Sequence, residues 1–301
     1  MCIDGVHDMS EQIPLSNNDR ADRERDGLHI VTDDVAYKRL MLVNVILIGK
    51  AGAGPGGWVL IDAGVTGSLG AIRKAAAERF GENATPACII QTHGHFDHVG
   101  ALEELAEEWN VPVYAHPLEI PYLDGSNSYP PPDPKVGGGM MSTLSPLYSR
   151  GPVNVKEHLR TLPEDGSVPD LPGWKWIHTP GHAPGHISLW READRLLISG
   201  DAVITTDQES AYAVATQKPE LHGPPMYFTI DWELSERSVK ELAALDPQII
   251  VSSHGQAMQG LEMLAALHRL ANEFRDLAVP STGRYVEDPQ WVKKGEAYRK
   301  P

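Results

Sequence analysis

The chain contains 301 residues and carries a formal charge of −15, and its length suits one large α/β domain or two small ones. The acidic balance argues against a nucleic-acid partner and against anionic membranes, because phosphate binding requires a surface rich in lysine and arginine. The two cysteines, Cys2 and Cys88, argue against a disulfide framework. The chain also shows neither an apolar run of about 18 residues nor a signal-peptide pattern, so we expect a cytoplasmic protein.

Residues 1–27 are polar and show no sustained periodicity, so we expect an N-terminal arm that is loose or packed on a partner subunit. Strand-like apolar runs follow at Leu28–Val31, Leu40–Ile48 and Trp58–Ile61. Ser68 and Gly81 have the residue types of a helix cap and a helix stop, and they frame a predicted helix between them.

A histidine-rich turn comes next in the chain. The apolar run Ala87–Gln91 predicts a buried strand, and helical spacing of apolar residues predicts a helix over 100–109. Four side chains that can bind metal occupy the turn between these elements: His93, His95, Asp97 and His98. A turn held between a strand and a helix can keep such side chains in a fixed geometry, which a metal site requires.

The spacing within this turn favours two metal ions. His93 and His95 can project the same way and hold one ion, whereas Asp97 and His98 lie further along and are free to hold a second. Imidazole and carboxylate without thiolate suit zinc first, with iron and manganese as alternatives. The competing interpretation is a polar loop whose histidines cap the helix or bond to the backbone.

Residues 117–153 differ from the rest because they are rich in proline and glycine and carry apolar side chains without regular spacing. We interpret this segment as a lid or pocket wall, since long ordered loops are uncommon unless they are functional. Its deformable apolar surface comprises Met140, Met141, Leu144 and Tyr148. The alternatives are an arm that forms a homodimer and a plain surface insertion.

The second half of the chain repeats the alternation of strands and helices. The predicted elements are strands at Trp174–His178, Ile187–Trp190, Leu196–Ser199 and Ile249–Ser252, and helices over 232–245 and 261–277. Three of these strands run into a residue that can bind metal: His182, Asp201 and His254. Loops at strand ends converge at one edge of an α/β sheet, so we expect these residues to join the histidine-rich turn.

No linker separates the two halves, so we expect one α/β domain over 28–278 built of two similar αβ layers, with a C-terminal tail over 279–301. The motif order Thr-His-x-His-x-Asp-His, Pro-Gly-His, Gly-Asp and Ser-His-Gly resembles the metallo-β-lactamase superfamily of hydrolases over this domain. The resemblance implies a single-domain, four-layer αβ/βα sandwich with two zinc ions at one edge.

The same resemblance implies roles for individual residues. His93, His95 and His182 would bind the first zinc, Asp97, His98 and His254 the second, and Asp201 would bridge both. Two zinc ions make hydroxide available at neutral pH and polarise a carbonyl group. Asp97 is then the expected catalytic residue, which steers the hydroxide and passes a proton to the leaving group.

Other histidines have simpler interpretations. His186 follows His182 by four residues, and we expect it either to support a metal ligand from outside the site or to shape the loop. For His116, orienting a ligand and a structural role remain equal alternatives.

Departures from the patterns of individual families limit the substrate classes that we expect. Glyoxalase II-like thioesterases add a basic C-terminal region that is absent from 256–278, and many lactonases have a tyrosine where this chain has Ile204. Tyrosines elsewhere could replace it: Tyr129, Tyr148, Tyr212 and Tyr227. We expect a small, uncharged or hydrophobic ester or lactone. The alternatives are a phosphodiester, a phosphotriester or a thioester on the same site, and a metal-binding protein without turnover.

Overall fold

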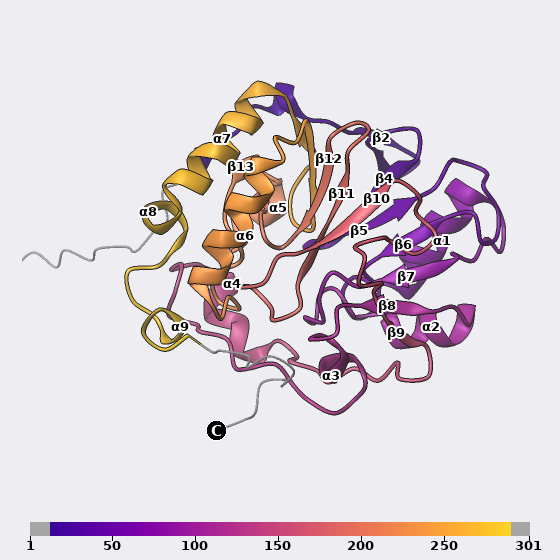
Figure 1. Cartoon of the computed structure of the whole chain (residues 1–301), viewed down its shortest axis with the longest axis horizontal. Helices are drawn as coiled ribbons and strands as arrows, with labels where there is room; N and C mark the ends of the chain where they lie inside the picture. The colour runs from indigo at the N-terminus through magenta and orange to yellow at the C-terminus, as the bar shows by residue number, and fades with distance from the viewer. Residues whose placement is uncertain (1–12, 290–301) are drawn as a thin grey trace, which may run out of the picture.

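Two β-sheets form the centre of the structure, a computed structural model that describes residues 13–289 (Figure 1). The larger sheet has the spatial order β2-β3-β4-β5-β6-β7-β8-β9, spanning Arg23–Arg25, Leu28–Ile30, Val35–Leu40, Val43–Ile48, Val59–Ile61, Cys88–Ile90, Val113–Ala115 and Leu159–Thr161. The smaller sheet has the order β10-β11-β12-β14-β15, spanning Trp174–His178, Ile187–Arg191, Leu196–Gly200, Ile249–Ser252 and Met258–Gln259. A separate pair joins β1 (Ile13–Pro14) to β13 (Glu220–Leu221).

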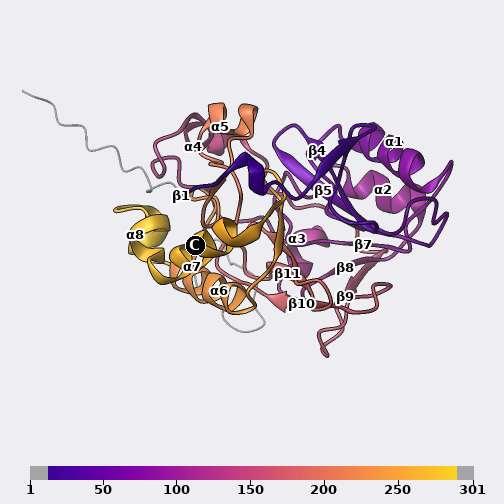
Figure 2. The ribbon, with the colours of Figure 1, turned by 90° about the horizontal axis from the view of Figure 1, so that it is seen from above.

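Helices cover the outer face of each sheet (Figure 2). Helices α1 (Leu69–Phe80) and α2 (Leu102–Trp109) lie on the larger sheet, and α6 (Trp232–Ala244) and α7 (Gly260–Asn272) lie on the smaller one. The shorter helices are α3 (Ile120–Leu123), α4 (Met140–Leu144), α5 (Ala211–Thr216), α8 (Phe274–Ala278) and α9 (Arg284–Glu287), with 3-10 turns η1 (Asn17–Asp19) and η2 (Ser145–Leu147).

The alternation of side chains along β5 shows how the layers are held. Val45 and Leu47 pack beneath α1 and α2, whereas Ile46 and Ile48 point the other way into the core between the two sheets. A third core lies between the smaller sheet and helices α6 and α7. The fold is therefore the expected four-layer αβ/βα sandwich.

Several boundaries differ from the sequence-based predictions. The run expected at Leu40–Ile48 consists of the last residue of β4, a reversal at Met41 and Leu42, and strand β5. Met41 takes a left-handed backbone conformation there, with φ of 60°. The final helix over 261–277 is interrupted at Glu273, which separates α7 from α8.

The described part of the expected N-terminal arm, 13–27, packs on its own chain and is not loose. Strand β1 pairs with β13, β2 pairs with β3, and the amide of Ala21 donates to the carbonyl of Ala257 at 2.8 Å. At the other end, the amide of Arg284 in α9 donates to Asp133 at 2.6 Å, within segment 117–153.

The remaining residues of the arm and the tail, 1–12 and 290–301, lie outside the described range. Within residues 13–289, no helix has the length and apolar character to cross a membrane. The division into arm, catalytic domain and tail stays a prediction.

Candidate metal centre

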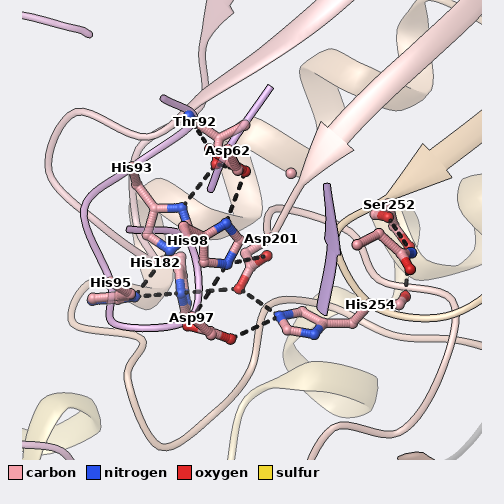
Figure 3. Close-up of polar contacts among 12 residues, drawn as sticks. Asp62, Thr92, His93, His95, Asp97, His98, His182, Asp201, Ser252 and His254 are labelled. Atoms are coloured by element: carbon pink, nitrogen blue, oxygen red, sulfur yellow. Dashed lines mark hydrogen bonds and ion pairs between the residues drawn. The ribbon is translucent and has the colours of Figure 1, made fainter. Parts of the chain in front are cut away.

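The first cluster joins three histidine side chains from two loops. His93 and His95 follow β7, and His182 lies in the loop between β10 and β11 (Figure 3). Atom Nε2 of His93 lies 3.0 Å from Nδ1 of His95. That Nδ1 atom lies 2.9 Å from Nε2 of His182. The three buried side chains could therefore hold one metal ion.

The second cluster combines imidazole with carboxylate. Asp97 and His98 complete the histidine-rich turn, and His254 follows β14; their ligand atoms lie within 4.8 Å of one another. Atom Nε2 of His254 lies 3.6 Å from Oδ2 of Asp97, and Nε2 of His98 lies 3.8 Å from Oδ1. These three side chains could hold a second ion.

Asp201 lies between the clusters, directly after β12. Its Oδ2 atom is 3.4 Å from Nε2 of His182 in the first cluster and 3.2 Å from Nε2 of His254 in the second. Its Oδ1 atom is 3.4 Å from Nε2 of His98. One carboxylate thus contacts both clusters, as expected for a bridging ligand.

The outer ring nitrogens of these histidines have partners of their own. Nδ1 of His98 lies 2.8 Å from Asp62, and Nδ1 of His254 lies 2.7 Å from the carbonyl of Leu42. Nδ1 of His182 lies 3.2 Å from the Thr229 hydroxyl. Such contacts fix the orientation of each ring and keep the other nitrogen directed at the centre.

Asp62 also organises the start of the turn. Its carboxylate accepts the amide of Thr92 at 2.8 Å and the Thr92 hydroxyl at 2.8 Å, and that hydroxyl lies 3.1 Å from Nδ1 of His93. The Asp62-Ala-Gly turn is visible in the sequence, but only the fold reveals that it supports the two ends of the histidine-rich turn.

His186 contacts both the backbone of a predicted ligand and the start of its own loop. Its Nε2 atom accepts the amide of Asp201 at 2.9 Å, and its Nδ1 atom lies 2.8 Å from the Thr179 hydroxyl. His116 instead stacks on His178, with ring centroids 4.1 Å apart, and its Nδ1 atom accepts the amide of Leu118. These contacts give His116 a structural role.

The two clusters differ in their electrostatics. Burial lowers the pKa of His93 and His95 well below the usual value, and it lowers the pKa of His182 to about 4. Burial also opposes protonation of His98, but the nearby carboxylates of Asp201 and Asp97 raise the pKa of His98 well above its usual value. The first cluster thus offers neutral imidazoles, the form that binds metal, whereas the second places carboxylates directly against its imidazoles.

The donor atoms fit a pair of cations. Nε2 of His98 and Oδ1 of Asp201 are among the buried atoms without a hydrogen-bond partner within residues 13–289, although each desolvated group needs one. A cation between them would satisfy both. Nitrogen ligands at about 2.0–2.1 Å from a tetrahedral zinc ion lie roughly 3.3 Å apart, close to the separations in the first cluster.

An aromatic wall, formed by Phe96, Tyr148 and Phe228, lies beside the centre. Phe96 stacks on Tyr148 with ring centroids 4.7 Å apart, and Phe228 stacks on His95 at 4.7 Å. Tyr148 belongs to segment 117–153, so this segment reaches the histidine-rich turn. The Tyr148 hydroxyl also donates to Sδ of Met141 at 3.7 Å, whereas Met140 is 59% exposed and Leu144 is 40% exposed.

The four tyrosines considered from the sequence have different positions. Tyr148 and Tyr227 lie near Asp97; burial is the main cause that raises their pKa values, and the charge of Asp97 adds to it. Tyr129 packs its ring against His95 at 4.3 Å between centroids. Tyr212 is 73% exposed. Glu119, buried between the loops of the first cluster, is a further residue that the sequence did not single out.

Comparisons with known proteins agree with this geometry. The family model of the metallo-beta-lactamase superfamily matches residues 39–254. The probable metallo-hydrolase YflN of Bacillus subtilis (strain 168) is 47% identical over 251 residues, which cover 83% of this chain and 92% of that protein.

Solved structures show the same architecture. A beta-lactamase domain protein from Burkholderia ambifaria has a TM-score of 0.59 at 20% identity, over 84% of this chain and 75% of that one. The protein TTHA1623 in a di-iron-bound form has a TM-score of 0.50 at 25% identity, over 77% of this chain and 96% of that one. The chain therefore belongs to the metallo-β-lactamase superfamily and is a metal-dependent hydrolase.

Proposed function

We propose that the protein hydrolyses an ester or lactone bond in an uncharged or hydrophobic small molecule. The proposal places one metal ion on the first cluster and one on the second, with Asp201 as the ligand of both. The observation that carries the substrate class is the aromatic wall, which contacts His95 through Phe228 and adjoins Asp97 through Phe96. An acyl chain or ring packed on this wall would remove apolar surface from water, which favours binding.

The charges near the wall also favour an uncharged substrate. Segment 117–153 carries Lys135 and Arg150 as its only basic side chains. Lys135 is exposed, and the guanidinium of Arg150 donates to the backbone carbonyl of Tyr129 at 3.1 Å. A phosphodiester would require cations that clamp its charged oxygens, and Arg150 is already engaged in holding the segment.

The chain's own residues have distinct tasks in this proposal. When bound, two metal ions would make hydroxide available at neutral pH and polarise the carbonyl oxygen of the substrate. Asp97 orients the attacking hydroxide and transfers a proton to the departing alkoxide. Tyr148 and Tyr227 keep their phenolic protons at neutral pH and can donate hydrogen bonds to substrate oxygens near Asp97.

Zinc is the proposed metal, because five imidazoles and two carboxylates without thiolate suit it. Iron and manganese are the alternatives, and the di-iron form of TTHA1623 supports keeping iron among them. Metal analysis of protein purified without chelator should return close to two equivalents per chain, and a value near zero after metal loading would contradict the two-ion proposal.

A substrate panel tests the reaction. The protein should hydrolyse alkyl esters or lactones faster than a glutathione thioester, a phosphodiester or a phosphotriester, and chelator should abolish the activity. If the protein hydrolyses the thioester, the phosphodiester or the phosphotriester fastest, that compound class would take the place of esters and lactones as the proposed substrate. No chelator-sensitive hydrolysis of any member of the panel would contradict the proposal and favour a metal-binding protein without turnover.

A further inference from the structure

Glu119 is a buried carboxylate between the two loops of the first cluster. It follows the turn after β8 and directly precedes α3, and its exposed fraction is 0%. An ionisable side chain is rarely buried to this extent without specific partners, because desolvating a charge is unfavourable. Its contacts therefore indicate what it does.

The carboxylate links two backbone segments that come from different sheets. Oε2 accepts the amide of Gly94 at 3.0 Å, and Gly94 lies between His93 and His95. Oε1 accepts the amide of Gly185 at 2.7 Å, and Gly185 lies in the loop that carries His182. Glu119 itself belongs to neither loop, yet each of its oxygens holds one of them.

The close approach favours glycine at both amides. A Cβ atom on Gly185 would lie 2.9 Å from Cγ of Glu119 and 2.9 Å from Nδ1 of His116. A Cβ atom on Gly94 would lie 3.0 Å from the hydroxyl oxygen of Tyr129. Side chains at these positions would push the loops away from the carboxylate, so the two glycines and Glu119 form one arrangement.

Tyr129 extends the arrangement to a ligand ring. Its hydroxyl donates to Oε2 of Glu119 and accepts the amide of Gly94 at 2.9 Å. Its ring lies 4.3 Å from the ring of His95 and stacks on Tyr122 at 3.9 Å between centroids. The phenol therefore connects Glu119 to the side chain of His95 as well as to the backbone beside it.

We propose that Glu119 is a positioning residue that fixes the distance between the His93–His95 turn and the His182 loop, and so sets the affinity and geometry of the first metal site. The inference rests on the proposed assignment of that site, but it does not depend on the substrate. Glu119 touches no ligand side chain; it acts through the backbone on either side of the ligands.

Glu119→Gln is the sharpest variant, because it keeps the size of the side chain and removes one acceptor. The single amide oxygen can accept from Gly94 or from Gly185, and the NH₂ group then faces the other backbone donor. Glu119→Asp keeps both oxygens and the charge but is one methylene shorter, so it cannot reach both loops. Glu157→Gln is the matched control, because Glu157 is exposed and lies outside the described contacts of the centre.

The measurement is titration of chelator-treated full-length protein with Co²⁺, followed by its visible absorption spectrum. Wild type and Glu157→Gln should bind two equivalents. Glu119→Gln should bind one of them about 10- to 100-fold more weakly, with an altered absorption band, while the other equivalent is unchanged. Circular dichroism establishes that each variant is folded, and Glu119→Asp serves as the test if Glu119→Gln is not.

Each outcome has a definite reading. Wild-type affinities and spectra in a folded Glu119→Gln or Glu119→Asp variant would overturn the inference. Failure of wild type to bind cobalt would overturn the metal assignment and the inference together. A weakened cobalt site in Glu119→Gln, combined with no ester or lactone hydrolysis by wild type, would support the inference and contradict the proposed substrate class.

Discussion

The candidate metal centre and segment 117–153 are in contact but are held very differently. Every ligand residue is at most 5% exposed, and the rings of His98, His182 and His254 are also held from outside the centre. The segment has Leu147 81% exposed and Met140 59% exposed, and it meets the histidine-rich turn through Tyr148 stacked on Phe96. We infer a division of labour, in which the centre performs the reaction and the segment selects the substrate.

The largest expected effect is in the centre. Asp201→Ala removes the carboxylate that contacts both clusters, so hydrolysis of every substrate should fall by two or more decades, or about 3 kcal/mol in transition-state stabilisation. Steady-state kinetics and metal analysis measure this. Asp165→Ala, in an exposed turn, is the control. Near-normal turnover with two metals still bound would show that Asp201 is not the bridge.

A smaller, substrate-dependent effect is expected in the segment. Met141→Ser should raise KM for long-chain esters or lactones by about tenfold, because roughly 50 Å² of apolar contact is worth about 1.3 kcal/mol, while a small aryl acetate should be unaffected. Met140→Ser is the matched comparison, because its side chain is exposed whereas Met141 contacts Tyr148 and the core.

If Met141→Ser raises KM equally for long-chain substrates and for the small aryl acetate, the segment does not select the substrate and its role is structural. If Met140→Ser raises KM for long-chain substrates more than Met141→Ser does, the segment still selects the substrate, but through its exposed face.

The smallest expected effect concerns the Tyr148 hydroxyl. Burial and the charge of Asp97 raise its pKa above the ordinary value of 10.0, so the phenol stays protonated and remains a donor at higher pH than usual. Tyr148→Phe should lower kcat/KM by about threefold, the typical worth of one hydrogen bond. The ratio of wild type to variant should be constant from about pH 6 to about pH 9, and a ratio that declines across this range would mean that the phenol ionises.

The sequence predicted the ligands of the metal centre better than the residues that orient those ligands. Trp174–His178 and Ile249–Ser252 are strands with those bounds, and the residues after strand ends meet as expected because adjacent strands end at one edge. Strand β4, Val35–Leu40, was missed apart from its last residue, because Lys38 and Arg39 interrupt the apolar pattern.

The residues that orient the metal ligands could not be predicted, because they are distant in sequence from the groups they contact. Glu119 is separated by 25 residues from Gly94 and by 66 residues from Gly185, so no local spacing connects them. Asp62 is likewise 36 residues from His98. Each ligand motif consists of a few adjacent residues and can be recognised in the sequence. The groups that orient the ligands are distant in sequence and are brought together only by the fold.

The origin of the ligands in both sheets has a consequence for the lifetime of the protein. The histidine-rich turn belongs to the larger sheet, and His182, Asp201 and His254 belong to the smaller one. Ions bound to both would act as a clip that exists only in the folded chain, and at a metal concentration about 1,000 times the Kd this linkage adds about 4.1 kcal/mol to the free energy of unfolding. Chelated protein should therefore have a lower Tm, and in a cell short of metal it would be unfolded and degraded sooner, so that the metal supply controls how much of the protein persists.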